Sequence, residues 1–214
     1  MADIVLDKQS VPTTPASGKG IIFIDSTASI LAYRDDAGLV HARSNNAAIT
    51  SQASGFATDT WVTNSDLLIP SWGLQAKTLF LWTISASKTA AGTVAPIYNI
   101  RIGSARTTAD TARVTLTGPA QTAIADIGTL WIIATVRNIG AAGIIQATAW
   151  WVHRGTAASN NSGVGFANDT TGHVEGASAA FDMSTLAGQY VSLSLNGGAS
   201  AAWTTTQVLS QGDW

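Results

Sequence analysis

The chain has 214 residues, of which 46% are hydrophobic and only 11% are charged, and its formal net charge is −2. It contains no cysteine, which excludes disulfides, thiolate nucleophiles and zinc–thiolate sites. Its Lys and Arg residues are scattered singly, whereas nucleic-acid binding needs a clustered basic patch, so we expect no nucleic-acid partner. We expect no signal peptide and no membrane insertion, because no segment approaches the ~20 apolar residues that span a bilayer.

The first section, residues 1–45, is predicted to be an N-terminal anchoring arm followed by a small β-meander. Ile4, Val5 and Leu6 form an apolar start, and Pro12 and Pro15 then disfavour helix and remove backbone donors. Residues 1–20 are too short to bury enough surface to offset their ordering entropy, so we expect an extended segment that is disordered alone. On a neighbouring protein, residues 4–6 are expected to add a strand to an exposed sheet edge.

The meander is predicted from strand patterns at residues 21–25, 30–34 and 39–42. Between the last two strands, Asp35-Asp36-Ala37-Gly38 favours a hairpin turn over a cation site, because Asp and Gly supply local caps and positive φ angles. A calcium loop would need further oxygen ligands at fixed spacing. Three short strands are too few to be stable alone, so we expect them to dock on another chain or on copies of themselves.

Residues 46–55 are polar and small and are predicted to be a connector. Residues 56–214 then show recurring alternation of apolar and polar residues, bounded by Gly, Asn, Asp and Pro. Strands are expected at 60–63, 67–70, 79–87, 97–102, 112–117, 130–137, 144–153, 190–195 and 203–209. The segment 130–137 is nearly all apolar, which predicts cover on both of its faces. The chain is therefore predicted to be all-β, with a jelly-roll-like β-sandwich over residues 56–214.

Tryptophan is abundant, with eight residues in the chain. Trp82 lies on an alternating apolar face and is expected in the core. Trp150 and Trp151 are neighbours in one predicted strand, so their rings point to opposite faces and one of them must lie outside the sheet core. Two roles stay open for such an outward ring, namely a contact between subunits, which we favour, and a platform for a glycan.

No pattern of residues indicates catalysis, a cofactor or a metal. His41, His153 and His173 are far apart in the sequence, and no Gly-x-Ser-x-Gly elbow is present. The acids lie mostly in turn-like settings, without the flanking pair that a glycosidase needs. We therefore expect no catalytic, cofactor-binding or metal site, and a protein that is not an enzyme. A third alternative is an enzyme that acts on a cell-surface polysaccharide.

Several turn and strand signatures resemble those of tailed-phage virion proteins. They are residues 14–19 before a strand, the hairpin at 33–38, and the segments 88–96, 110–113 and 196–203. The resemblance implies a structural component of a tailed-phage virion that decorates the capsid or forms a short fibre, with the N-terminal arm as its attachment. The expected location is the virion, assembled in the host cytoplasm.

The resemblance also implies partners. It suggests a homotrimer bound to the major capsid protein or to tail or portal-vertex proteins. The low charge points the same way, because a surface with 11% charged residues is poorly protected from self-association and closed cyclic symmetry supplies partners without open-ended aggregation. The alternative is a tail-fibre or receptor-binding adhesin whose β-sandwich recognises a host surface glycan.

Overall fold

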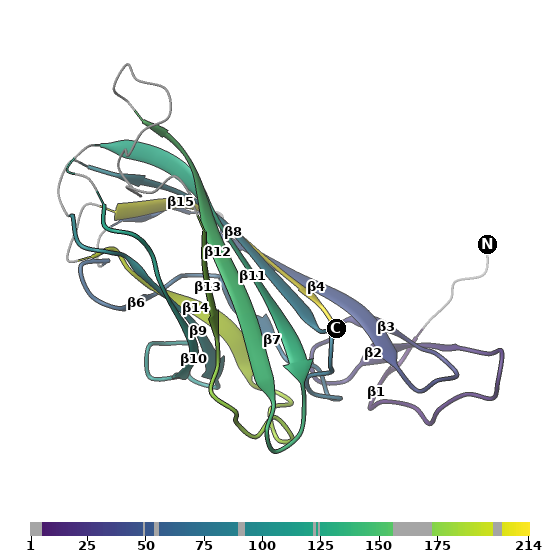
Figure 1. Ribbon diagram of the computed structural model, residues 1–214. Coiled ribbons are helices and arrows are strands. Elements are labelled where there is room, and N and C mark those ends of the chain that lie inside the picture. Colours follow the sequence, from purple (N-terminus) through teal and green to yellow (C-terminus); the bar gives the residue numbers. More distant parts are fainter. Residues whose placement is uncertain are drawn as a thin grey trace, which may run out of the picture.

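The computed structural model describes residues 6–48, 50–53, 56–89, 93–121, 123, 125–155, 173–198 and 203–214. Every regular element in these residues is a strand, which confirms the all-β prediction (Figure 1). In chain order the strands are β1 (Lys8–Gln9), β2 (Ile21–Asp25), β3 (Leu31–Arg34), β4 (Val40–Ala48), β5 (Gln52–Ala53), β6 (Thr60–Trp61), β7 (Leu67–Leu68), β8 (Leu79–Lys88), β9 (Ile97–Gly103), β10 (Thr111–Thr117), β11 (Asp126–Asn138), β12 (Ile144–Gly155), β13 (His173–Ala177), β14 (Tyr190–Asn196) and β15 (Trp203–Asp213).

The strands form two sheets, a ten-stranded sheet and a five-stranded sheet. The larger has the order β1-β2-β3-β4-β15-β8-β11-β12-β13, with β5 also paired to β15. The smaller has the order β10-β9-β14-β6, with β7 also paired to β14. Their inward side chains share one hydrophobic core, so residues 56–214 build a two-layer sandwich. The jelly-roll connectivity that we expected within it stays a prediction.

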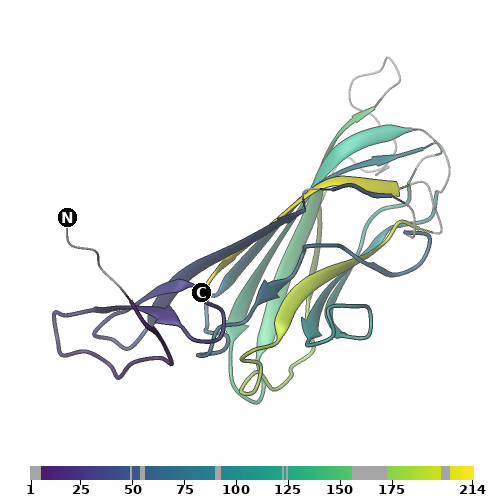
Figure 2. The ribbon, with the colours of Figure 1, turned by 180° about the vertical axis from the view of Figure 1, so that it is seen from behind.

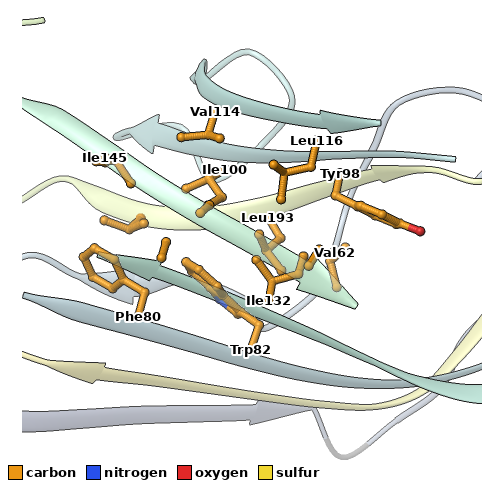
Figure 3. Close-up of a cluster of buried hydrophobic side chains, with 14 of the residues drawn as sticks. Val62, Phe80, Trp82, Tyr98, Ile100, Val114, Leu116, Ile132, Ile145 and Leu193 are labelled. Atoms are coloured by element: carbon orange, nitrogen blue, oxygen red, sulfur yellow. The ribbon is translucent and has the colours of Figure 1, made fainter. Parts of the chain in front are cut away.

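The core follows from alternation along the long strands. On β8, every second residue from Phe80 to Lys88 is buried, and on β9 Tyr98, Ile100 and Ile102 point inward. Figure 3 shows Phe80, Trp82 and Ile132 of the larger sheet facing Ile100, Val114 and Leu116 of the smaller sheet. Trp82 is fully buried, as predicted. Because each strand gives one face to this core, the sheet period alone places most of the large side chains.

Strand β11 departs from the sequence prediction. Leu130, Ile132, Ala134 and Val136 are buried, but the residues between them are only half-buried. The expected cover on both faces of 130–137 is therefore wrong. The physical reason is that no second layer packs on the far side of the ten-stranded sheet among the described residues.

The N-terminal module, defined here as residues 6–42, stands beyond the sandwich at one end of the molecule, near the C-terminus (Figure 2). Strands β2, β3 and β4 form the expected antiparallel meander. Its own small core consists of Phe23, Ala32 and Val40, with Val11 and Trp72 packed against it. Trp72, a residue of the sandwich, thus covers part of the small core of the meander.

The arm is folded against this meander, which corrects our expectation of an extended, disordered segment. Strand β1 pairs with β2 in parallel, and the Arg34 guanidinium donates to the carbonyl of Pro12. The Gly18 N–H donates to the Asp36 carboxylate at 2.6 Å. These partners within the module satisfy backbone groups that an isolated arm would leave to water. Ile4 and Val5 lie outside the described residues.

The predicted connector at 46–55 is also wrong. Strand β4 continues to Ala48 and pairs with β15 from Arg43 to Ala48, and Gln52 and Ala53 pair with β15 as well. Small polar side chains gave no strand signal, but backbone pairing needs no apolar side chain. The N-terminal module and the sandwich therefore share one sheet through β4.

The turn at residues 35–38 is a hairpin turn, as predicted. The Leu39 N–H donates to the Asp35 carboxylate at 2.8 Å, and Gly38 has a φ of 86°. His41 Nε2 lies 3.0 Å from the other carboxylate oxygen, and this hydrogen bond is the main reason why the pKa of Asp35 is lowered. The acidic side chains of this segment thus form hydrogen bonds with nearby backbone N–H groups and with the neighbouring histidine.

No helix in the described part of the chain has the length and apolar character needed to cross a membrane. The same residues contain no group of three His, Cys, Asp or Glu side chains placed to hold a metal ion.

Candidate functional site

The far side of the ten-stranded sheet, called here the outer face, is the most distinctive surface of the molecule. Directly paired residues on neighbouring strands point to the same side of a sheet. One such row runs across the outer face from β4 to β13 and consists of Ala47, Leu209, Thr83, Trp131, Trp150 and His173. A second row in the N-terminal module consists of Ile22, Tyr33 and His41.

Exposed apolar side chains gather on this face. Among the described residues, nine large hydrophobic side chains are exposed, and six of them lie in the outward alternation of the ten-stranded sheet. The six are Ile22, Leu31, Tyr33, Ile127, Val152 and Leu209. The other three, Leu39, Val94 and Ile139, lie in turns or loops. Scattered exposed apolar residues are ordinary, but a concentration on one sheet face indicates an interaction surface.

The middle of the outer face also lacks ionisable groups. The outward residues of β8 are two leucines, a threonine and two serines, and the outward run of β11 from Ile127 to Thr135 has no charge either. Charged residues border this stretch: Arg43 and Asp213 form an ion pair at 2.7 Å towards the N-terminal module, exposed Arg137 follows on β11, and Arg154 on β12 is the register partner of Ile127. At the opposite edge, His173 and Glu175 lie 4.0 Å apart on β13. Any partner of the central region therefore meets a neutral surface.

Two tryptophans occupy the centre of this region. Trp131 on β11 and Trp150 on β12 are direct cross-strand partners, and their rings stack with centroids 5.9 Å apart and an interplanar angle of 26°. Both side chains are half-buried. The sequence prediction identified Trp150 as a candidate outward ring but missed Trp131. The hairpin register between β11 and β12 was the signal that would have paired them.

Trp151 points the other way, as the alternation predicted, and is not a surface residue. Its indole N–H donates to the Tyr98 hydroxyl at 2.6 Å, and its ring packs edge-on against Trp203 with centroids 5.4 Å apart. Of the two rings proposed as interface or glycan contacts, only Trp150 lies on the outer face. Trp151 belongs to the sandwich core.

A small hollow lies beside these rings. It is lined mainly by Tyr98, Pro119, Trp150, Trp151, His173 and Val174. Its lining includes an imidazole but no carboxylate, so it does not assemble the acid pair that glycoside hydrolysis uses. The lining also contains the phenol of Tyr98, which is buried. This burial raises the pKa of the Tyr98 hydroxyl far above its ordinary value of 10.0.

Because Tyr98 is buried, the free energy of unfolding is expected to depend on pH in the alkaline range. Its folded-state pKa is raised, so the folded chain keeps a proton that the unfolded chain releases above about pH 10. The contribution of this group to the free energy of unfolding is therefore fully present below about pH 10. It falls as pH rises further, by at most about 1.4 kcal/mol per pH unit. Urea unfolding between pH 8 and 11 measures this slope.

The matched variant is Tyr98→Phe. It removes the hydrogen bond from Trp151, with an expected loss of about 1–2 kcal/mol at pH 8. The difference in unfolding free energy between the two proteins should shrink above pH 10, because only the wild type carries this titration. A difference that stays constant up to pH 11 would contradict the assignment.

The outer side of the smaller sheet is closed rather than open. Arg101 is largely buried there and donates to the Ser194 hydroxyl at 2.7 Å and to the Asp59 carboxylate. It also donates to the carbonyls of Thr108 and Asp110. These contacts hold the segments around residues 59 and 108–110 across the sheet. The cluster around Arg101 contains no imidazole or thiol, and its contacts give it a structural role. The sequence prediction missed this cluster.

The proposed arm residues lie in the N-terminal module where they are described. Leu6, Pro12 and Pro15 are half-buried, and Pro12 is fixed through its carbonyl by Arg34. The structure does not bring them together with Trp150, which lies on β12 in the sandwich. The candidate residues therefore belong to two separate regions, the N-terminal module and the centre of the outer face.

No family model matches the chain, and no curated protein matches it. Among solved structures, a β-1,3-glucanase from Mycobacterium marinum aligns over 94% of this chain and 95% of its own length, with 9% sequence identity and a TM-score of 0.16. A TM-score this low carries no information on fold or activity.

Proposed function

We propose that this chain is a non-enzymatic structural subunit of a tailed-phage virion, which decorates the capsid or forms a short fibre. The observation that carries the proposal is the apolar outer face, which is neutral at its centre and holds six of the nine exposed large hydrophobic side chains of the described residues. Such a face serves a protein that works by assembling with other subunits. The virion assignment itself rests on the sequence resemblance.

Attachment is assigned to the N-terminal module. Four of the nine exposed residues, Ile22, Leu31, Tyr33 and Leu39, lie on it, and the module projects beyond the sandwich at one end of the molecule (Figure 2). Each of these side chains is about half exposed, so its burial against a partner would contribute roughly half of the ~1.5–3 kcal/mol of full burial, before the cost of association. The proposed partners are the major capsid protein or tail or portal-vertex proteins, and the location is the virion, assembled in the host cytoplasm.

The first residues extend this attachment surface. Strand β1 is an edge strand of the ten-stranded sheet, and Ile4, Val5 and Leu6 precede it in the chain, with Asp7 between them. An apolar segment next to an edge strand is suited to pairing with a strand of another protein through main-chain hydrogen bonds. In this proposal, the arm and the module face act together on one virion protein.

Particle incorporation tests the attachment. The double change Ile22→Asp and Leu31→Asp places two carboxylates on the module face, where both wild-type side chains are more than half exposed, so the fold should persist. We expect occupancy on particles to fall at least tenfold, with unchanged thermal unfolding. Val94→Asp, at an equally exposed loop position, is the control and should be incorporated normally.

Normal occupancy of the double variant would contradict attachment through the module face. The separate double change Ile4→Asp and Leu6→Asp then shows whether the arm is the anchor. If neither double variant changes occupancy, or if the wild-type protein is absent from purified particles, the proposed function is wrong.

The second candidate function is an adhesin that recognises a host surface glycan through the sandwich. Trp150 supports it, because its half-buried ring lies on the same sheet face as Thr83, Thr129 and Thr148. Aromatic rings beside hydroxyl groups are suited to stacking on neutral sugars. Binding of the purified protein to a glycan array, lost in Trp150→Ala, would favour this function over the structural one.

A further inference from the structure

We propose that Asp25 fixes the N-terminal module in one orientation on the sandwich, so that the two parts move as a single rigid body. The carboxylate of this residue is buried where a loop of the sandwich meets the end of β2. The inference concerns the purified chain, so it goes beyond the proposed function and does not depend on the virion assignment.

Strand pairing by itself leaves this orientation open. In the described part of the chain, the sheet connects the module to the sandwich through β4 alone. Strand β3 pairs with β4 from Val40 to Ala42, and β15 pairs with it from Arg43 to Ala48. The two pairings overlap only at Ala42, whose carbonyl also accepts the Trp214 N–H. A single strand between two such pairings can bend through a few φ and ψ angles, as hinge segments do.

The loop at residues 70–75 of the sandwich packs on the module and supplies a second connection. The Trp72 ring packs edge-on against Phe23 of β2, with centroids 6.0 Å apart and an interplanar angle of 73°. The Gln75 side-chain amide donates to the Val40 carbonyl at 2.8 Å, so the same loop also reaches β4. Because this loop contacts two strands of the module, it opposes bending of the module about β4.

Asp25, the last residue of β2, forms the central link between the two parts. Its side chain is fully buried, and among the described residues no cation forms an ion pair with it. Within the module, one of its carboxylate oxygens accepts the N–H groups of Thr27 at 3.1 Å and Ala28 at 2.6 Å. From the sandwich, the Ser71 hydroxyl donates to the other oxygen, and the Ser71 N–H donates to it at 3.3 Å. One carboxylate is thus shared by a turn of the module and a loop of the sandwich.

This shared carboxylate selects one orientation for a physical reason. A buried carboxylate is tolerated only where hydrogen-bond donors replace its lost hydration. A rotation that withdraws Ser71 leaves one oxygen of Asp25 without its donors, whereas an apolar contact such as Trp72 on Phe23 is not directional. Hydrogen bonds to a charged acceptor are also stronger than neutral ones. In the proposed attachment, a partner bound to the module therefore also sets the direction in which the sandwich points.

The distance between two spin labels tests the inference. Cysteines replace Ile22 on β2 and Leu209 on β15, which are 57% and 42% exposed, and the chain contains no other cysteine. The labelled protein is diluted into unlabelled protein, so that double electron–electron resonance records only distances within one chain. We expect one narrow distance in the otherwise unchanged chain. In Asp25→Ala the distribution should broaden at least about twofold while thermal unfolding of the sandwich stays the same.

A second variant and a control separate orientation from folding of the module. Ser71→Ala removes a donor on the sandwich side and leaves every residue of the module in place, so broadening there reports the link itself. Asp36→Ala removes the hydrogen bond to Gly18, which lies wholly within the module, and should keep the narrow distance. A distance that stays narrow in Asp25→Ala or in Ser71→Ala would overturn the inference, as would a broad distribution in the unchanged chain.

Discussion

Replacing Trp82 with alanine is expected to lower the free energy of unfolding by about 4 kcal/mol. The side chain is fully buried, its ring stacks on Phe80 with centroids 5.8 Å apart, and its indole N–H donates to the Ser65 carbonyl at 2.8 Å. The variant loses the apolar contacts, opens a cavity between the two sheets and leaves the Ser65 carbonyl without this donor. Urea unfolding at neutral pH measures the loss.

A graded variant separates these contributions. Trp82→Phe keeps most of the ring volume and removes the hydrogen bond, so its expected loss is about 1–2 kcal/mol. The order of stability should be wild type, then phenylalanine, then alanine. A loss below about 1 kcal/mol for alanine would show that Trp82 does not occupy the core of the sandwich.

Removing residues 1–55 is expected to leave a folded sandwich that is less stable by about 3–6 kcal/mol, at roughly 1 kcal/mol for each lost ladder hydrogen bond. All the buried residues of the main core lie at Phe56 or later in the chain. The truncation nevertheless strips β4 from β15 and removes two hydrogen bonds of Trp214, one to the Ala42 carbonyl and one to the Ser44 hydroxyl. The exposed β15 edge should also make the truncated chain more prone to aggregate.

The control is a chain that lacks only residues 1–20. It keeps β4 on β15 and loses β1, the contacts of Val11 and Pro12 and the hydrogen bond from Gly18 to Asp36, all within the N-terminal module, so thermal unfolding of the sandwich should be nearly unchanged. An unfolded 56–214 chain would mean that the sandwich depends on the N-terminal module. Full stability of that chain would mean that the β4–β15 pairing contributes nothing.

The strands with clean alternation were predictable from the sequence. The expected strand at 79–87 is β8 (Leu79–Lys88), and the expected strand at 97–102 is β9 (Ile97–Gly103). In both, the side chains that alternate with polar residues are the ones that enter the core. The turn at Asp35 was predictable as well, because its Asp and Gly residues satisfy their hydrogen bonds locally.

The pairing of distant strands was not predictable in this way. Strand β4 was cut short at residue 42 because Ser44, Asn45 and Asn46 carry no apolar signal, yet their backbone pairs with β15 some 170 residues later. Strand β13 was missed for the same reason, since only one residue of its five, Val174, is a large apolar one. The stacked pair of Trp131 and Trp150 depends on strand register, which composition and periodicity leave open.

The central claim is that this protein works by assembling through neutral sheet surfaces rather than by catalysis. Sedimentation equilibrium of the wild-type chain at micromolar concentration tests it most directly. The account predicts a closed species of three times the 22.0 kDa chain mass, unchanged in about 0.5 M salt because the proposed contacts carry no net charge. A folded species of 22.0 kDa that persists across the accessible concentration range would contradict it.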